Sequence, residues 1–210
     1  MKDAQGDPAY GRTNWRRFAV AAAVPAAAAG ALVFGMANGA FAASFTVSGQ
    51  AFKISADRLE GNGFAQYGGH DDTVNGKQIP VAVSGIASAE LYNLCQSVKT
   101  PGLPVVLTIR AGREAGKPAK ATDLVIGVSE LSGEAKFTDI NIGQDASTLG
   151  LGGKAAKGKP GDFGQEAKHV TITDLRQTAV STTAGTFTLS GLNMKVNLPG
   201  ADGKPPAECF

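Results

Sequence analysis

Hydrophobic and polar residues alternate over much of the chain after residue 44, which is the pattern of half-buried β-strands. The alternating runs are rich in Val, Ile, Phe and Thr, residues that favour extended structure, and cover residues 45–54, 79–83, 124–128, 170–172 and 187–198. A more continuously apolar run at 103–109 predicts a central strand. Residues 87–98 fit a helix as well, but their similarity to the β-rich 135–143 favours a strand.

Two similar decapeptides stand at the ends of this region. FTVSGQAFKI begins at Phe45 and FTLSGLNMKV at Phe187, and further Ser-Gly pairs begin at Ser84 and Ser132. The uneven spacing of these pairs excludes a solenoid of fixed period and fits strand pairs joined by loops of different lengths. We therefore predict an all-β domain, an antiparallel curved sheet forming a sandwich or flattened barrel, built from hairpin repeats that Ser-Gly marks. Gly49 and Gly191 predict a bulge or bend in such strands.

Loops are expected where Gly, Pro and charged residues gather, at 60–80, 111–123 and 149–168. The last segment is too long for a plain hairpin turn, and loops of that length are usually functional or mobile.

The first 42 residues have the layout of a secretory signal. Arg16 and Arg17 precede the uncharged, Ala-rich stretch 18–35, and Ala40 and Ala42 form an A-x-A site. We expect a signal peptide at 1–42 and a single β domain at 43–210, secreted or at the cell surface. A retained N-terminal anchor is the alternative. The arginine pair leaves the export route, general or twin-arginine, open.

Charge gives little indication of a partner once this segment is set aside. Residues 43–210 hold sixteen basic and sixteen acidic side chains, so we expect no nucleic-acid partner. Five lysines in two predicted loops are candidates for contact with an anionic surface if the loops lie together: Lys117, Lys120, Lys154, Lys157 and Lys159.

The two cysteines, Cys95 and Cys209, predict one disulfide in an exported chain. Two free or intermolecular thiols are the alternative.

Motifs of catalysis are incomplete. GVSEL at 127–131 lacks the second glycine of G-x-S-x-G, and nothing in the sequence brings His70 or His169 to Ser129. GKAAKGKP, from Gly153, lacks the Ser or Thr that a phosphate-binding loop needs after its lysine. His70, Asp71 and Asp72 are interpreted as a solvated turn. We predict no catalytic residue, cofactor or metal, and leave enzymatic activity uncertain.

Small residues suggest a different type of site. Ala51, Ala56, Ala87 and Ala135 would line an apolar groove wide enough for an acyl chain if the sheet curves around them. The alternative is that they only allow two sheet layers to pack closely.

FTVSGQAFKISADRLEGNGFAQY, from Phe45, and LYNLCQSVKTPGLPVVLTIRAG, from Leu91, resemble a family of small secreted actinobacterial proteins of unknown function. Some of its members are labelled cholesterol esterase. The resemblance offers no catalytic motif. Our expectation is a non-enzymatic cell-envelope protein that binds a lipid or other apolar ligand, or docks on a membrane partner. The alternatives are a self-associating structural protein, whose oligomeric state the sequence leaves open, and the esterase that the label implies.

Overall fold

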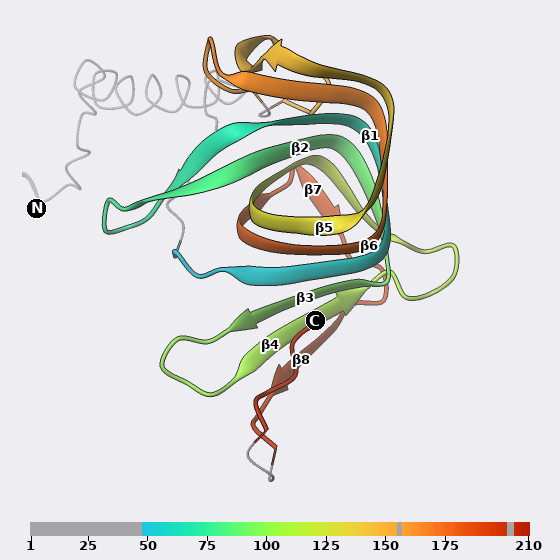
Figure 1. The fold of residues 1–210 in the computed structure, drawn as a ribbon. Coiled ribbons are helices and arrows are strands. Elements are labelled where there is room, and N and C mark those ends of the chain that lie inside the picture. Colours follow the sequence, from blue (N-terminus) through green and yellow to red (C-terminus); the bar gives the residue numbers. More distant parts are fainter. Residues whose placement is uncertain (1–47, 155–156, 201–203) are drawn as a thin grey trace, which may run out of the picture. The chain divides into compact units, whose positions relative to one another are not determined.

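The computed structural model describes residues 48–154, 157–200 and 204–210, and within them the fold is all-β. The described strands are β1 (Phe52–Asp72), β2 (Gln78–Tyr92), β3 (Leu94–Lys99), β4 (Val106–Ala111), β5 (Ala119–Asp145), β6 (Phe163–Thr183), β7 (Thr186–Thr188) and β8 (Asn193–Asn197). A 3-10 turn, η1 (Ala146–Thr148), follows β5. The prediction of an antiparallel, curved all-β sheet is confirmed (Figure 1).

Four long strands form the body of the sheet. Each is antiparallel to two others, because β1 pairs with β2 and β6, and β5 also pairs with β2 and β6. The ladders therefore close a circuit of four strands. Figure 1 shows these strands turning sharply at one side, so that the two ends of one strand lie on different sides of the curved sheet. In β5 the pairing shifts register between Ser132 and Glu134, and Gly133 between them has a φ of 151°.

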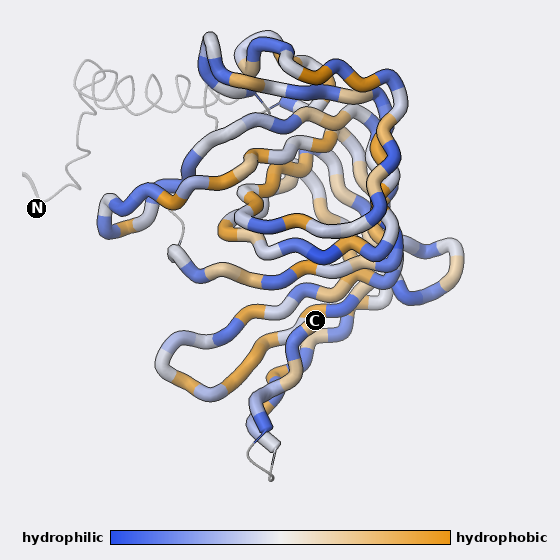
Figure 2. Tube along the Cα trace, in the orientation of Figure 1, coloured by the Kyte–Doolittle hydropathy of each residue, from blue (hydrophilic) through white to orange (hydrophobic). Residues whose placement is uncertain are grey.

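Most of the buried apolar side chains of the circuit belong to one core. The largest buried cluster joins residues from β1, β2, β5 and β6, and the rings of Phe64 and Phe137 lie 5.3 Å apart at its edge. Figure 2 shows the alternation of hydrophobic and hydrophilic positions along these strands. This packing is what the alternation in the sequence predicts.

The ends of the two similar decapeptides, 52–54 and 194–196, occupy equivalent places on the two sides of the β3–β4 hairpin. Phe52 in β1 lies opposite Val98 in β3, and Met194 in β8 lies opposite Ile109 in β4. In the same way Ile54 lies opposite Gln96, and Val196 opposite Leu107. Within the hairpin Val98 faces Leu107 and Gln96 faces Ile109. A local two-fold axis between β3 and β4 therefore relates the pair Phe52–Val98 to the pair Met194–Ile109, and the pair Ile54–Gln96 to the pair Val196–Leu107.

The glycines of the decapeptides also match in backbone conformation. Gly49 and Gly191 have φ values of 77° and 64°. Gly191 lies in the turn between β7, which pairs with β5, and β8, which pairs with β4. In both copies, a glycine with positive φ precedes the strand that pairs with the β3–β4 hairpin. The other two Ser-Gly pairs lie inside strands, at Ser84 in β2 and Ser132 in β5, and not at hairpin turns.

The predicted loop at 60–80 is wrong, because all but 73–77 belongs to β1 and β2. The glycines that suggested a loop serve close packing instead. A Cβ at Gly61 would lie 2.8 Å from the Val170 side chain and 2.9 Å from that of Ile86. His70, Asp71 and Asp72 therefore lie in a strand and not in a turn. The predicted loop at 149–168 is correct to residue 162, where β6 follows.

Four Asp or Asn residues that precede Leu or Ile have a left-handed backbone conformation. Asn93, Asp123, Asp139 and Asp174 are the described non-glycine residues with a positive φ, all between 47° and 53°. Asp and Asn tolerate this left-handed conformation better than other residues with a side chain. The strand pairing skips Asp123, Asp139 and Asp174, and Asn93 separates β2 from β3.

Residues 1–42, predicted to be a signal peptide, lie outside the described residues. Within the part of the chain that the structure describes, no helix has the length and apolar character needed to span a membrane.

Candidate apolar binding face

Strands β3, β4 and β8 extend the sheet beyond the four-strand circuit. Their register places five apolar side chains on one side, which we call the apolar face: Val98, Leu107, Ile109, Met194 and Val196. Phe52 lies beside Val98 on the same side and packs against the core, so the apolar face continues the surface that faces the core.

The outer part of the apolar face is open to solvent. Met194 and Val196 are 59% and 58% exposed, and Leu198, just after β8, is 67% exposed. Val98, Leu107 and Ile109 are half-buried. Strand β8 pairs with β4 alone among the described strands, so its outer backbone edge is also free. An open edge next to exposed apolar side chains is unusual for a monomer and typical of a surface that another molecule covers.

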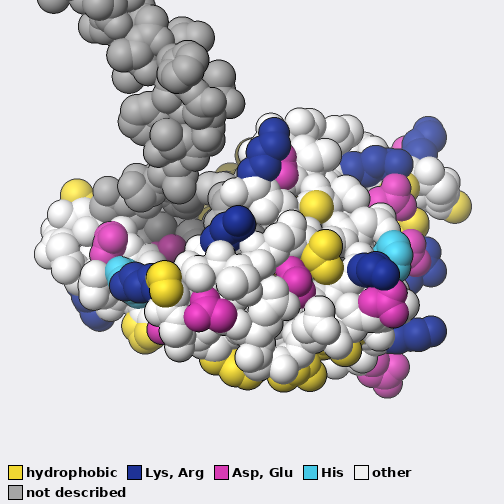
Figure 3. Space-filling model, turned by 90° about the horizontal axis from the view of Figure 1, so that it is seen from above, with side chains coloured by type: hydrophobic (Ala, Val, Ile, Leu, Met, Phe, Trp, Pro, Cys, Tyr) yellow, Lys and Arg dark blue, Asp and Glu magenta, His cyan; other side chains and the backbone are white. Residues whose placement is uncertain are grey.

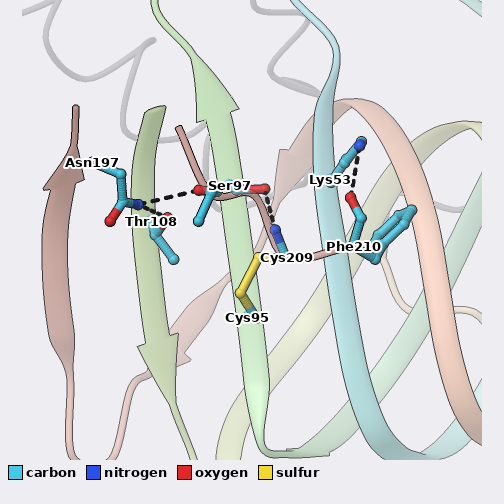
Figure 4. The surroundings of a disulfide bond; sticks show 8 residues. Lys53, Cys95, Ser97, Thr108, Asn197, Cys209 and Phe210 are labelled. Carbon is cyan, nitrogen blue, oxygen red and sulfur yellow. Dashed lines mark hydrogen bonds between the residues drawn. A yellow bond between two sulfur atoms is a disulfide. The ribbon is translucent and has the colours of Figure 1, made fainter. Parts of the chain in front are cut away.

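The opposite side of the same strands is covered by the C-terminal segment, residues 204–210. The predicted disulfide is present, and Cys95 and Cys209 have Cα atoms 5.8 Å apart. The Cys209 amide donates to Ser97 Oγ at 3.1 Å, and Asn197 Nδ2 donates to Thr108 Oγ1 at 2.6 Å (Figure 4). Asn197 Nδ2 also donates to the Ala207 carbonyl at 3.2 Å.

Charged groups fix the last residues of this segment. Glu208 lies 3.4 Å from Lys53 Nζ and 3.1 Å from Lys99 Nζ. Lys53 Nζ donates to the Phe210 carbonyl at 2.7 Å and lies over its ring (Figure 4). Ser97 and Thr108 are buried as a result, whereas no described segment covers Met194 and Val196 on the apolar face. Within the described residues, the chain therefore covers one side of this three-stranded sheet and leaves the outer part of the other side exposed.

The structure does not gather the four predicted groove alanines into one place. Ala56 is in the core, and Ala51 is exposed just before β1. Ala87 is half-buried in β2 close to Gly153 of the long loop, and Ala135 is exposed in β5. Their environments differ, and the apolar face includes none of them.

The five predicted lysines divide into separate groups. Lys117 pairs with Glu114 at 2.7 Å, and Lys120 pairs with Glu90 at 2.8 Å. The Lys120 contact, followed by a hydrogen bond from the Tyr92 hydroxyl, lowers the pKa of Glu90 below its ordinary value.

The other three lysines belong to the long loop after η1. The backbone amide of Lys154 donates to the Asp123 carboxylate at 3.2 Å. Lys157 and Lys159 line one pocket. On the face seen in Figure 3, basic and acidic side chains are interspersed.

Ser129, the serine of the incomplete hydrolase motif, is exposed on β5 and donates its hydroxyl to the Thr178 carbonyl at 3.1 Å. The described residues contain no group of three or more His, Cys, Asp or Glu side chains placed to hold a metal ion. His70 lies 3.9 Å from Asp72, while Asp71 accepts a hydrogen bond from Ser181 at 2.6 Å.

Sequence reasoning did not identify Met194 and Val196 as site residues, although it placed them in a strand. The signal was present in the repeat, because these residues align with Phe52 and Ile54. Alternation predicts that one side of a strand is apolar but does not show whether another element covers it.

Residues 48–210 match a protein family described as a family of unknown function (DUF6230), and the chain therefore belongs to this family. No curated protein matches the chain, and no solved structure matches it.

Proposed function

We propose that this member of the family is a non-enzymatic, exported cell-envelope protein that binds a lipid or another apolar partner on the apolar face. One observation carries the proposal: Met194 and Val196 are exposed beside a free strand edge. Their counterparts in the repeat, Phe52 and Ile54, instead pack against or in the core. Two similar apolar strands are thus formed, and the described residues cover only the first of them.

Burial of the exposed side chains of this face would favour binding. Full burial of a Val, Leu or Met side chain contributes about 1.5 to 3 kcal/mol. Met194, Val196 and Leu198 are each more than half exposed. An acyl chain or an apolar surface laid across them would gain part of that energy from each residue.

Export is supported by two features. The disulfide between Cys95 and Cys209 is of the kind that persists in an oxidising compartment. The sequence before residue 43 has the layout of a signal. Fractionation of cells that express the full chain, with antibody detection, tests the location. Recovery in the cytosol with free thiols would contradict it.

Binding is tested with purified protein and vesicles of neutral phosphatidylcholine, by flotation and by native mass spectrometry. We expect the protein to float with the vesicles or to retain lipid, and the double variant Met194→Asp, Val196→Asp to lose at least tenfold in binding. Val74→Asp is the matched control, because Val74 is 78% exposed in the turn after β1, outside the apolar face. Equal binding by both variants would reject this face as the site.

A second function, structural self-association, is favoured by the free edge of β8. Sedimentation at increasing protein concentration distinguishes it from lipid binding. A concentration-dependent oligomer that forms without lipid and is lost in the Met194→Asp, Val196→Asp variant would support self-association. The esterase that the label of the resembled actinobacterial proteins implies would require hydrolysis of a p-nitrophenyl ester that is lost in Ser129→Ala.

A further inference from the structure

A separate pocket, of about 590 Å³, lies where the ladder between β1 and β6 ends. The last β1–β6 pair is Tyr67 with Gly164, whereas β1 stays paired with β2 as far as Asp72. From Gly68 onward β1 therefore has β2 as its only strand partner within the described sheet. Gly68, Gly69 and His70 line the pocket at this edge. A ligand there can approach the backbone, since the two glycines carry no side chain.

The other wall of the pocket is the loop segment 157–159, with Asp162. Gly158 is fixed by its amide, which donates to the Ala146 carbonyl at 3.0 Å. A Cβ at Gly158 would lie 2.6 Å from Ala146 Cβ and 2.8 Å from the Tyr67 ring, so only glycine lets the loop lie this close. Lys157 and Lys159, on either side of this fixed point, both line the pocket.

Buried and capped carboxylates hold the rest of the loop. The Glu166 carboxylate, in a residue that is 9% exposed, accepts hydrogen bonds from the amides of Gly150 and Leu151 at 2.9 and 3.1 Å. Asp145 accepts from the Gly161 amide at 2.7 Å. The backbone that carries the two lysines is therefore anchored on both sides, and a preorganised site loses less entropy when a ligand binds.

The charges at the pocket favour an anion. Lys157 and Lys159 form no ion pair within the described residues, whereas Lys117 and Lys120 do. Asp162 is the carboxylate among the lining residues, so two ammonium groups oppose one negative charge in the lining. Asp71 and Asp72 do not line the pocket, although burial, and then the negative charge of Asp71, raise the pKa of the lining residue Tyr67. Asp71 also accepts the Ser181 hydrogen bond, and Asp72 lies 3.9 Å from His70.

We propose that this pocket binds the phosphate group of an organic phosphate ester, either a soluble one or a lipid headgroup. A phosphate offers charge to both ammonium groups and oxygen acceptors to exposed backbone amides, and lysine is a common phosphate-binding residue. The volume lies within the range of small-molecule sites and leaves room for the organic part beside Tyr67 and Val83. The proposal does not depend on the apolar face.

The test uses the purified protein and titration calorimetry at low ionic strength. Glycerol 1-phosphate is the soluble probe, glycerol its uncharged control, and vesicles containing phosphatidylglycerol the lipid arm. We expect glycerol 1-phosphate or the vesicles to bind, glycerol not to bind, and Lys157→Gln, Lys159→Gln to weaken binding at least tenfold.

The matched control is Lys117→Gln, Lys120→Gln, which removes the same charge elsewhere and should change binding less than twofold. Binding in the soluble arm assigns the pocket to free esters, and binding to vesicles alone assigns it to headgroups. The proposal is overturned if neither probe binds, or if both double variants bind equally. Vesicles of neutral phosphatidylcholine, which test the apolar face, should not respond to the Lys157→Gln, Lys159→Gln change, so failures of the two proposals are distinguishable.

Discussion

Ile54 and Val196 lie at equivalent positions on the two sides of the β3–β4 hairpin, yet Ile54 is 5% exposed and Val196 is 58% exposed. The difference comes from what lies beside each strand. Ile54 has Gln177 of β6 as its neighbour on the other side, and the core packs over it. Within the described residues, β8 has no second neighbour. The local two-fold relation of the sequence is therefore broken by the surrounding structure.

This relationship predicts a large difference between two similar substitutions. Ile54→Ala should lower the free energy of unfolding by about 2 to 5 kcal/mol, because it leaves a cavity in the core. Val196→Ala should change it by less than about 0.5 kcal/mol, as expected for an exposed position. Urea denaturation of both variants measures the two values. A loss in Val196→Ala as large as that in Ile54→Ala would show that the apolar face is covered within the protein itself.

The disulfide supplies a second prediction. Cys95 and Cys209 are separated by 114 residues. The chain-entropy description of a crosslink gives roughly 4 to 5 kcal/mol for closing such a long loop. The double variant Cys95→Ser, Cys209→Ser should lose stability of that order in urea denaturation, as should the native protein under a reductant.

A control separates the crosslink from the packing of the C-terminal segment. Glu208→Gln weakens the contacts of the segment with Lys53 and Lys99 but keeps the disulfide. It should cost no more than about 1 kcal/mol, because both ion pairs are partly exposed. If Glu208→Gln were as destabilising as removal of both cysteines, the contacts and not the crosslink would provide the stability.

The sequence allowed the fold class and the disulfide to be predicted, and the reasons are local. Alternating Val, Ile and Phe favour a strand, and two cysteines allow only one intramolecular pairing. Glycine has no such single meaning. The sequence predicts a loop at Gly61, but this residue lies in β1. Glycine is needed there because two side chains from neighbouring strands occupy the space that a Cβ would fill. That space is set by residues 86 and 170, which only the folded sheet brings together.

The candidate sites depend even more on tertiary structure. Lys157 and Lys159 were identified from their charge, whereas the pocket beside them exists because β6 stops pairing with β1 at Gly164. Met194 and Val196 were recognised as strand residues, but their exposure reflects a missing neighbour. An absent neighbour leaves no mark in the local pattern of a strand.

The left-handed aspartates provide a third prediction. Asp174, with a φ of 51°, is exposed in β6. The pairing of β6 with β1 skips Asp174, and its pairing with β5 skips both Asp174 and Leu175. Asp174→Ala should destabilise the protein by about 1 kcal/mol, because alanine pays the steric cost of this conformation without the local polar compensation of Asp. Asp174→Asn is the control and should be nearly neutral. Thermal unfolding of both variants is the measurement, and equal stability of the two would show that φ at this position adjusts freely.

Asp145 supplies a prediction about pH. Its carboxylate accepts hydrogen bonds from the Ser147 hydroxyl at 2.7 Å, the Gly161 amide at 2.7 Å and the Ser147 amide at 2.9 Å. These bonds, with the Ser147 hydroxyl first, lower the pKa of Asp145 below its ordinary value of 3.8. A carboxyl group whose pKa is lower in the folded protein stabilises the fold above its unfolded pKa. That stabilisation is lost as the pH falls through the folded value.

Asp145→Asn imitates the protonated acid, so this variant should melt at a lower temperature than the native protein at pH 6. The difference in melting temperature should disappear as the pH falls below 3.8, the ordinary pKa of aspartate. Carboxyl NMR titration of the native protein should place the Asp145 midpoint below that same value. The closing gap is specific to the ionised carboxylate, because a purely steric effect of asparagine would not depend on pH. A difference in melting temperature that stays constant down to a pH of about 2 would show that the ionised Asp145 carboxylate does not stabilise the loop that carries Lys157 and Lys159.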